Sequence, residues 1–239
     1  MTALDIGQGQ SVVLHSHGVT ALIDCGSSSY GDAGDITADY LQSVGIRSVD
    51  YIVLSHYHDD HCNGLPTLLA RLKARELILP DIGDGDASRT EVLALAERYR
   101  IPVSFVHSTL SLPLGDAVIT VYPPVTESGD MNEVCLSVLC SAGSFDALFT
   151  GDMDTDSEYR LIATHELPDI EVLMAGHHGS RYSTGSDLLA EVKPETAVIS
   201  CEPGNRYGHP HAEALYRLAD LPAEIYRTDL QGSINITVH

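Results

Sequence analysis

Four candidate metal ligands lie within six residues of one another: His56, His58, Asp60 and His61. They directly follow the apolar run 51–54, which is typical of a buried strand. Imidazole and carboxylate groups are preferred ligands of zinc, manganese and iron ions. The spacing predicts that His56 and His58 converge on one cation and that Asp60 and His61 reach a second one. A solvated polar turn is the alternative, but so dense a cluster is rare by chance.

Other candidate ligands also follow predicted strands. Asp152 comes after 147–150, His177 and His178 come after 172–175, and His209 comes after 196–200. Because α/β proteins place ligand sites on loops at the carboxyl ends of strands, we expect these residues to gather with the first cluster. Neighbouring residues at a strand end point to opposite sides, so we expect a single metal ligand from the histidine pair.

The elements that must position these residues alternate along the chain. An initial hairpin is predicted by the alternating segments 11–15 and 19–24. Helices are then expected at 35–44, 65–72, 89–99, 156–165, 186–192 and 212–218. Strands are expected between them at 76–79, 103–106, 117–122, 134–140, 147–150, 172–175, 196–200, 225–227 and 233–238. This order predicts an α/β protein whose sheets are covered by helices on the outside.

The motif His56-x-His58-x-Asp60-His61 resembles the signature of the metallo-β-lactamase fold superfamily. Further landmarks follow in the order expected of that family, namely Leu22-Ile23-Asp24-Cys25-Gly26, Phe149-Thr150-Gly151-Asp152 and Ala175-Gly176-His177. The resemblance implies a single domain over residues 1–239. Its expected architecture is a four-layer αββα sandwich with the metal site at one edge of the two central sheets.

The resemblance also implies two divalent metal ions, Mn²⁺ or Zn²⁺, bridged by Asp152. One ion would be held by His56, His58 and Asp152, and the other by the ligands Asp60, His61, Asp152 and His177. Many family members carry another histidine about 20 residues before the bridging aspartate, where this chain has Asn132. Asn132 could serve as a weak oxygen ligand, and an oxygen-richer site suits Mn²⁺.

Within the superfamily, the chain is more similar to the C-terminal hydrolase domain of ComEC-type DNA-uptake proteins. This resemblance is carried by the segments 4–11, 176–180, 205–211 and 227–234. The first motif usually ends in Gly-Asp, whereas this chain has Gln10. The implied function is degradation of single-stranded DNA by a soluble domain tethered to a membrane DNA channel, on the extracytoplasmic face. A cytoplasmic stand-alone protein is the alternative location. The alternative activity is hydrolysis of a small phosphodiester, lactone or thioester.

In the expected mechanism, a water shared by the two ions is deprotonated and attacks phosphorus. Asp60 and His209 are the candidate catalytic residues, with His209 as the acid for the leaving group, or else a surface loop histidine. Asp24 is expected to orient a ligand histidine or the motif turn, and the alternative is capping of a strand end.

Substrate contacts are predicted for residues beside the motif loops: His178, Ser180, Arg206 and Arg227. An arginine can hold a phosphate with two parallel hydrogen bonds. For each arginine the alternative is an ion pair with one of the many acids, and for His178 it is a structural or ligand-orienting role.

Charge and cysteine content further limit the kinds of partner and structure that the sequence predicts. The sequence has 34 acidic and 13 basic residues, a formal net charge of −21. This charge argues against a broad basic face for nucleic acid, although two bound cations would reverse the sign locally. Weak affinity for DNA away from the site is therefore expected. No apolar run is long enough to span a membrane, and the five cysteines show no CxxC spacing and do not predict a disulfide framework.

Overall fold

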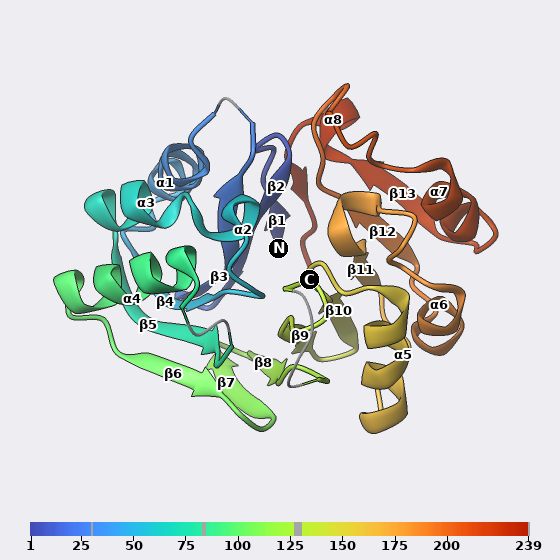
Figure 1. The fold of residues 1–239 in the computed structure, drawn as a ribbon, viewed down its shortest axis with the longest axis horizontal. Coiled ribbons are helices and arrows are strands. Elements are labelled where there is room, and N and C mark those ends of the chain that lie inside the picture. The colour runs from blue at the N-terminus through green and yellow to red at the C-terminus, as the bar shows by residue number, and fades with distance from the viewer. Residues whose placement is uncertain (30, 83–84, 127–130, 239) are drawn as a thin grey trace.

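The computed structural model describes residues 1–29, 31–82, 85–126 and 131–238. Two seven-stranded sheets lie face to face at the centre of the molecule (Figure 1). The first sheet has the order β14 (Ile234–Asn235), β1 (Thr2–Ala3), β2 (Gly9–Ser16), β3 (Val19–Ser27), β4 (Ser48–Val53), β5 (Lys73–Pro80) and β6 (Val103–Val106). The second has the order β13 (Glu224–Arg227), β12 (Thr196–Ile199), β11 (Val172–Met174), β10 (Phe145–Phe149), β9 (Ser137–Ala142), β8 (Ala117–Tyr122) and β7 (Leu110–Leu114).

Helices cover the outer face of each sheet (Figure 1). The first sheet is covered by α1 (Ala33–Ser43), α3 (Leu65–Arg71) and α4 (Ala87–Tyr99), and the second by α5 (Thr155–Thr164), α6 (Ser186–Val192) and α7 (Ala212–Ala219). Two short helices, α2 (Asp59–Cys62) and α8 (Thr228–Gln231), and the 3₁₀ turn Gly176–Gly179 complete the described elements. The αββα sandwich expected from the sequence is confirmed.

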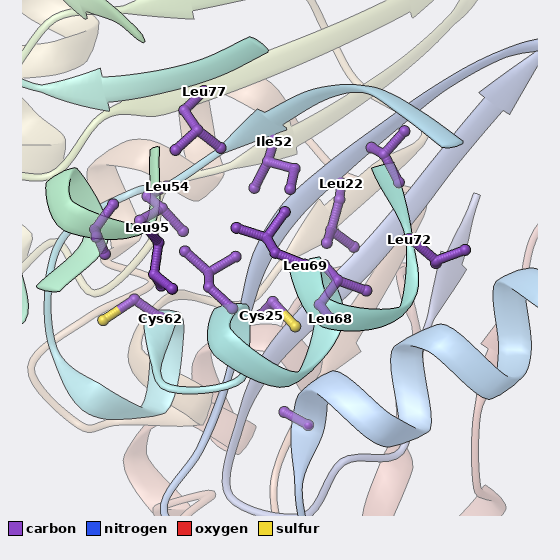
Figure 2. Packing of buried hydrophobic residues seen from close by; sticks show 14 of the residues in the cluster. Leu22, Cys25, Ile52, Leu54, Cys62, Leu68, Leu69, Leu72, Leu77 and Leu95 are labelled. Atoms are coloured by element: carbon purple, nitrogen blue, oxygen red, sulfur yellow. The ribbon is translucent and has the colours of Figure 1, made fainter. Parts of the chain in front are cut away.

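Alternating side chains along the strands build the layers. In β3, Leu22 packs into the core beneath the helices, whereas its neighbour Ile23 packs into the core between the sheets. This alternation is the two-residue period of a strand. Figure 2 shows the outer core, where strand residues meet helix residues: Leu22, Ile52 and Leu77 with Leu68, Leu69 and Leu95. Each fully buried leucine stabilises the fold by about 1.5–3 kcal/mol relative to an exposed one.

Parallel strands bring the candidate ligands to one edge of the sandwich. In the first sheet β3, β4 and β5 are parallel, and in the second β10, β11, β12 and β13 are parallel. The carboxyl ends of parallel neighbours lie at the same edge of a sheet. The segments that follow β4, β10, β11 and β12 therefore carry the candidate histidine and aspartate ligands and His209.

Some local expectations differ from the structure. The segment after β4 forms the helix α2 instead of a loop, and the strand expected at 134–140 begins at Ser137. Helix α1 begins at Ala33, because Asp32 accepts hydrogen bonds from two backbone N–H groups of the first turn. All five cysteines are free and buried. Among the described residues no helix is both long and apolar enough to cross a bilayer.

Candidate metal centre

The segment 55–61 follows β4, and two of its predicted ligands, His56 and His61, are fully buried. Nε2 of His56 lies 3.1 Å from Nδ1 of His58, as expected for two ligands of one cation. The His56 ring is buried, whereas His58 is exposed. Helix α2 begins at Asp59, and this turn carries Asp60 and the fully buried His61 toward the second sheet.

Asp24 holds this turn in place from the end of β3. Its carboxylate accepts hydrogen bonds from the backbone N–H of Ser55 at 2.7 Å and from Nδ1 of His61 at 2.8 Å. The Ser55 hydroxyl, at 2.9 Å, and Nε2 of Gln10, at 2.8 Å, also donate to it. Nε2 of His61 is therefore directed away from Asp24, toward Asp152. Asp24 thus lies where the sequence analysis placed a carboxylate that orients a ligand histidine.

The two carboxylate oxygens of Asp152 face two different groups of histidines. Oδ1 lies 3.0 Å from Nε2 of His61 and 3.7 Å from Nε2 of His178. Oδ2 lies 3.5 Å from Nε2 of His177 and 3.9 Å from Nε2 of His56. A carboxylate with this arrangement can bridge two cations.

The expectation that His177 and His178 point to opposite sides is wrong. Both residues have left-handed backbone angles, with φ of 50° and 56°, within the 3₁₀ turn Gly176–Gly179. Strand alternation therefore does not apply to them, and both rings face Asp152. Left-handed non-glycine residues are rare and are frequently found at functional sites.

The ring of His178 is a poor candidate for the predicted substrate contact because its side chain is only 2% exposed. Its Nδ1 lies 3.0 Å from the backbone carbonyl of Ser200, and so carries a proton and donates it. Its Nε2 then offers a lone pair, 3.6 Å from Oδ2 of Asp60. This environment is typical of a metal-binding histidine.

Two charged side chains hold the loop that follows this pair. Glu158, buried in α5, accepts hydrogen bonds from the backbone N–H groups of Thr184 and Gly185, both at 2.7 Å. Arg217 of α7 donates to three backbone carbonyls, those of Arg181, Ser183 and Thr184. Burial raises the pKa of Glu158 to about 7, although the two N–H groups and Arg217 act to lower it.

The electrostatics of the centre reflect its close-packed charges. Burial alone would lower the pKa of His61, but the Asp152 and Asp24 carboxylates outweigh burial and raise it well above the usual value. Burial would likewise raise the pKa of Asp152, but His61 and His178 hold it well below its ordinary value. Burial and the neighbouring His61 lower the pKa of His56.

The donor set fits a pair of divalent cations. Among the described residues, three buried atoms at the centre make no well-aligned hydrogen bond: Nε2 of His61, Nε2 of His178 and Oδ1 of Asp152. A buried polar atom without such a bond lowers the stability of the fold unless an ion or a water molecule binds to it. Two groups have ligand atoms that all lie within 4.8 Å of one another: His56 with His61 and Asp152, and Asp60 with His61 and His178. Nitrogen and oxygen donors of these kinds suit zinc or manganese.

The sequence family agrees with this geometry. A model of the metallo-beta-lactamase superfamily matches residues 4–202. The chain belongs to this superfamily. The fold is that of the metallo-beta-lactamase fold protein YhfI from Bacillus subtilis, with a TM-score of 0.64 at 15% identity over 98% of this chain and 99% of that chain. Metal-dependent hydrolysis is the general activity that membership in this superfamily supports.

The relatives in sequence are longer competence and recombination proteins. ComE operon protein 3 of Bacillus subtilis is 27% identical over 247 residues, which cover 97% of this chain and 32% of that protein. Recombination protein 2 of Haemophilus influenzae is 30% identical over 236 residues, covering 98% of this chain and 28% of that protein. This superfamily member thus spans less than a third of the length of either relative. Competence protein ComA of Neisseria gonorrhoeae is 27% identical over 241 residues, covering 98% of this chain and 31% of that protein, so the expected likeness to competence proteins is confirmed.

Two predicted substrate contacts have other roles in this member of the superfamily. Arg227 is held by both carboxylate oxygens of Asp229, at 2.9 and 2.6 Å, so its charge is engaged within the chain. Ser180 is buried, and its hydroxyl accepts a hydrogen bond from the backbone N–H of Tyr182. The Arg227 guanidinium and the Ser180 hydroxyl therefore each have a partner within the chain, and their contact with substrate stays a prediction.

His209 and Arg206 remain accessible beside the centre. The His209 ring lies 5.5 Å from that of His177, measured between centroids. Burial, followed by the charges of His178 and His177, lowers the pKa of His209 to about 4. Arg206 is exposed on the same loop. Asn132 lies half-buried in a turn before β9, and its proposed role as a weak ligand stays a prediction.

Five residues that contact the candidate ligands or their loops are not among those predicted from the sequence: Gln10, Ser55, Glu158, Ser200 and Arg217. Gln10 stands where the related group usually has aspartate. Its amide donates to Asp24, which an ionised aspartate could not do. Ser55 could have been found from its place directly before the motif. For the others no local signal exists, because their partners are distant in the chain.

Proposed function

We propose that this protein is a metal-dependent phosphodiesterase that hydrolyses single-stranded DNA. The observation that carries the proposal is the arrangement of histidines and carboxylates on both sides of Asp152. Similarity to competence and recombination proteins over nearly the whole chain supports DNA as the substrate. A phosphodiester suits the centre because cations can offset the negative charge of the phosphate, which an acidic protein would otherwise repel.

We assign the ligands according to which oxygen of Asp152 they face. On the Oδ2 side are His56, with His58 beside it, and His177. On the Oδ1 side are His61 and His178, with Asp60 next to His178. In this assignment the histidine pair supplies one ligand to each ion, and His177 compensates for the histidine that many superfamily members have mid-chain. Two divalent ions bound there would activate water and polarise the phosphate.

His209, in its neutral form, is the candidate donor of a hydrogen bond to the oxygen that leaves, and the proton that this oxygen finally takes up comes from solvent water. Nε2 of Gln8 lies 3.3 Å from Nδ1 of His209, and the amide oxygen of Gln8 accepts from the backbone N–H of Glu202. The Gln8 amide nitrogen therefore donates to Nδ1, and the imidazole proton is placed on Nε2. The lowered pKa keeps this ring neutral at pH 7. Nε2–H can then donate a hydrogen bond to the oxygen that leaves.

We also propose that the domain works beside a membrane DNA channel, on the extracytoplasmic face, as part of a longer protein. Both relatives are more than three times as long as the matched region. The net charge of −21 predicts a high KM for free DNA. A channel that delivers the strand would raise its local concentration at the centre.

The proposal is tested with purified protein, a fluorescent single-stranded oligonucleotide and either Mn²⁺ or Zn²⁺. We expect cleavage by the wild type. The Asp152→Asn variant should lose at least about 1,000-fold in kcat, because the bridging carboxylate is gone. Metal content should fall from two ions per chain in the wild type to one or none in this variant.

A panel of substrates distinguishes the alternatives. Duplex DNA, a small phosphodiester, a lactone and a thioester are assayed under the same conditions. Intact single-stranded DNA with both metals, together with rapid turnover of the lactone or thioester, contradicts the proposal. Faster cleavage of a small phosphodiester than of DNA would place the protein among small-molecule phosphodiesterases instead.

A further inference from the structure

An exposed tyrosine beside the metal centre has no role in the proposed mechanism. Tyr207 lies on the segment 202–211 after β12, and 42% of its surface is exposed. Its ring is nearly parallel to that of His209, at 5.6 Å between centroids and 24° between planes. The His209 ring in turn stacks toward His178, at 6.4 Å and 28°. Two ring contacts thus connect Tyr207 with a candidate metal ligand.

Arg206 adds a positive charge to the same surface. Its guanidinium lies 4.7 Å from the centroid of the Tyr207 ring and donates a hydrogen bond to the Tyr207 hydroxyl. Other arginines near the centre are held by carboxylates, since Arg181 pairs with Glu213 and Arg227 pairs with Asp229. Arg206 instead rests on an aromatic ring, which leaves hydrogen-bonding capacity for a phosphate.

The loop that carries both residues is fixed in advance. The side-chain amide of Asn205 donates to the carbonyls of Glu202 and His209, at 2.8 and 2.6 Å. Its oxygen accepts from the backbone N–H groups of Tyr207 and His209, at 3.2 and 3.0 Å. These four bonds tie both ends of the loop to one side chain. Ordering of the loop on binding therefore costs little.

We propose that Arg206 and Tyr207 form a subsite for a nucleobase and the adjoining phosphate of a single strand that enters the metal centre. The inference rests on the proposed function and names the part of the substrate that is recognised. Aromatic rings and guanidinium planes both stack on unpaired bases, without preference for sequence. An acidic protein needs such a local element, because its wider surface repels DNA. A duplex would not satisfy the subsite, since its bases are already stacked.

The test compares wild type with Tyr207→Ala in the full chain, on a normal oligonucleotide and on one with abasic nucleotides. Loss of one base-stacking partner should raise KM about 5- to 100-fold on the normal strand and leave kcat nearly unchanged. On the abasic strand the two proteins should have the same KM. Tyr207→Phe should raise KM less than Tyr207→Ala does, because the ring is kept and only the hydrogen bond with Arg206 is lost. Tyr216→Ala, at a more exposed tyrosine on α7, is the matched control.

Equilibrium binding separates this inference from the proposed function. Fluorescence anisotropy of the labelled strand gives Kd whether or not cleavage occurs. Arg206→Gln should reduce the slope of log Kd against log salt concentration by about 0.7, the value for one phosphate contact on a single strand. If the wild type binds the strand but does not cleave it, the proposed function fails and the subsite stands. If Tyr207→Ala binds and cleaves the normal strand as the wild type does, the subsite is wrong.

Discussion

The two ligand-bearing segments of the centre are held in different ways. The segment 55–61 is fixed by one buried carboxylate, Asp24, which touches a ligand ring and the backbone at the start of the turn. The loop 176–185 is fixed from its far end. There Glu158 and Arg217 form hydrogen bonds with the backbone several residues away from His177 and His178. Neither side chain forms a hydrogen bond with either histidine ring.

This difference predicts which property, metal affinity or stability, should change on substitution in each segment. A carboxylate that contacts a ligand controls its orientation and basicity directly. Glu158 and Arg217, here called the clamp, bind the backbone only. They control His177 and His178 through the stiffness of the loop between the clamp and these histidines. The first region should therefore respond to substitution mainly in metal affinity, and the second mainly in stability.

Among the substitutions that distinguish the two segments, the largest effect is expected for Asp24→Asn. The amide that replaces the carboxylate cannot accept all four hydrogen bonds, and it no longer orients His61 as a carboxylate does. Affinity for Mn²⁺ or Zn²⁺, measured by competition with a chelating dye, should fall about 10- to 100-fold. Asp59→Asn is the control, since this exposed carboxylate lies in the same motif. Equal losses of metal affinity in both variants would mean that the affinity depends on the total negative charge of the motif and not on the contact between Asp24 and His61.

A smaller effect on metal affinity is expected for Arg217→Ala. Its three bonds to backbone carbonyls are lost, which should lower the free energy of unfolding by about 1–3 kcal/mol. Metal affinity should fall less than about tenfold, because the rings of the histidine pair keep their own contacts. Chemical denaturation and the same dye competition measure the two quantities. A loss of metal affinity as large as that of Asp24→Asn would remove the distinction between the two segments.

The same difference explains what the sequence could and could not predict. His56, His58, Asp60 and His61 are contiguous and follow a buried strand, so their spacing alone indicated a metal site. The four-layer fold followed from the alternation of strands and helices and from the family resemblance. The joint orientation of His177 and His178 could not be predicted, because it depends on two consecutive left-handed residues. Nor could the clamp be predicted, since Glu158 and Arg217 lie far in sequence from the loop positions that they bind.

The smallest effect is expected in the pH dependence of the stabilisation that Glu158 provides. The pKa of Glu158 is raised to about 7 in the folded protein from its ordinary value of 4.5, so between these pH values the folded state binds the proton more tightly than the unfolded state. This group's contribution to stability is therefore greatest at low pH and decreases as pH rises toward and through 7.

The variant Glu158→Gln carries a side chain that does not titrate. The free energy of unfolding of the wild type, relative to this variant, should thus decrease by about 1 kcal/mol from pH 6 to pH 7.5. Urea denaturation of both proteins at each pH measures this difference, in which other titrating groups cancel. A difference that is constant across this range, or that increases with pH, would show that Glu158 is ionised throughout and that the second segment is held by a permanent charge, as the first is by Asp24.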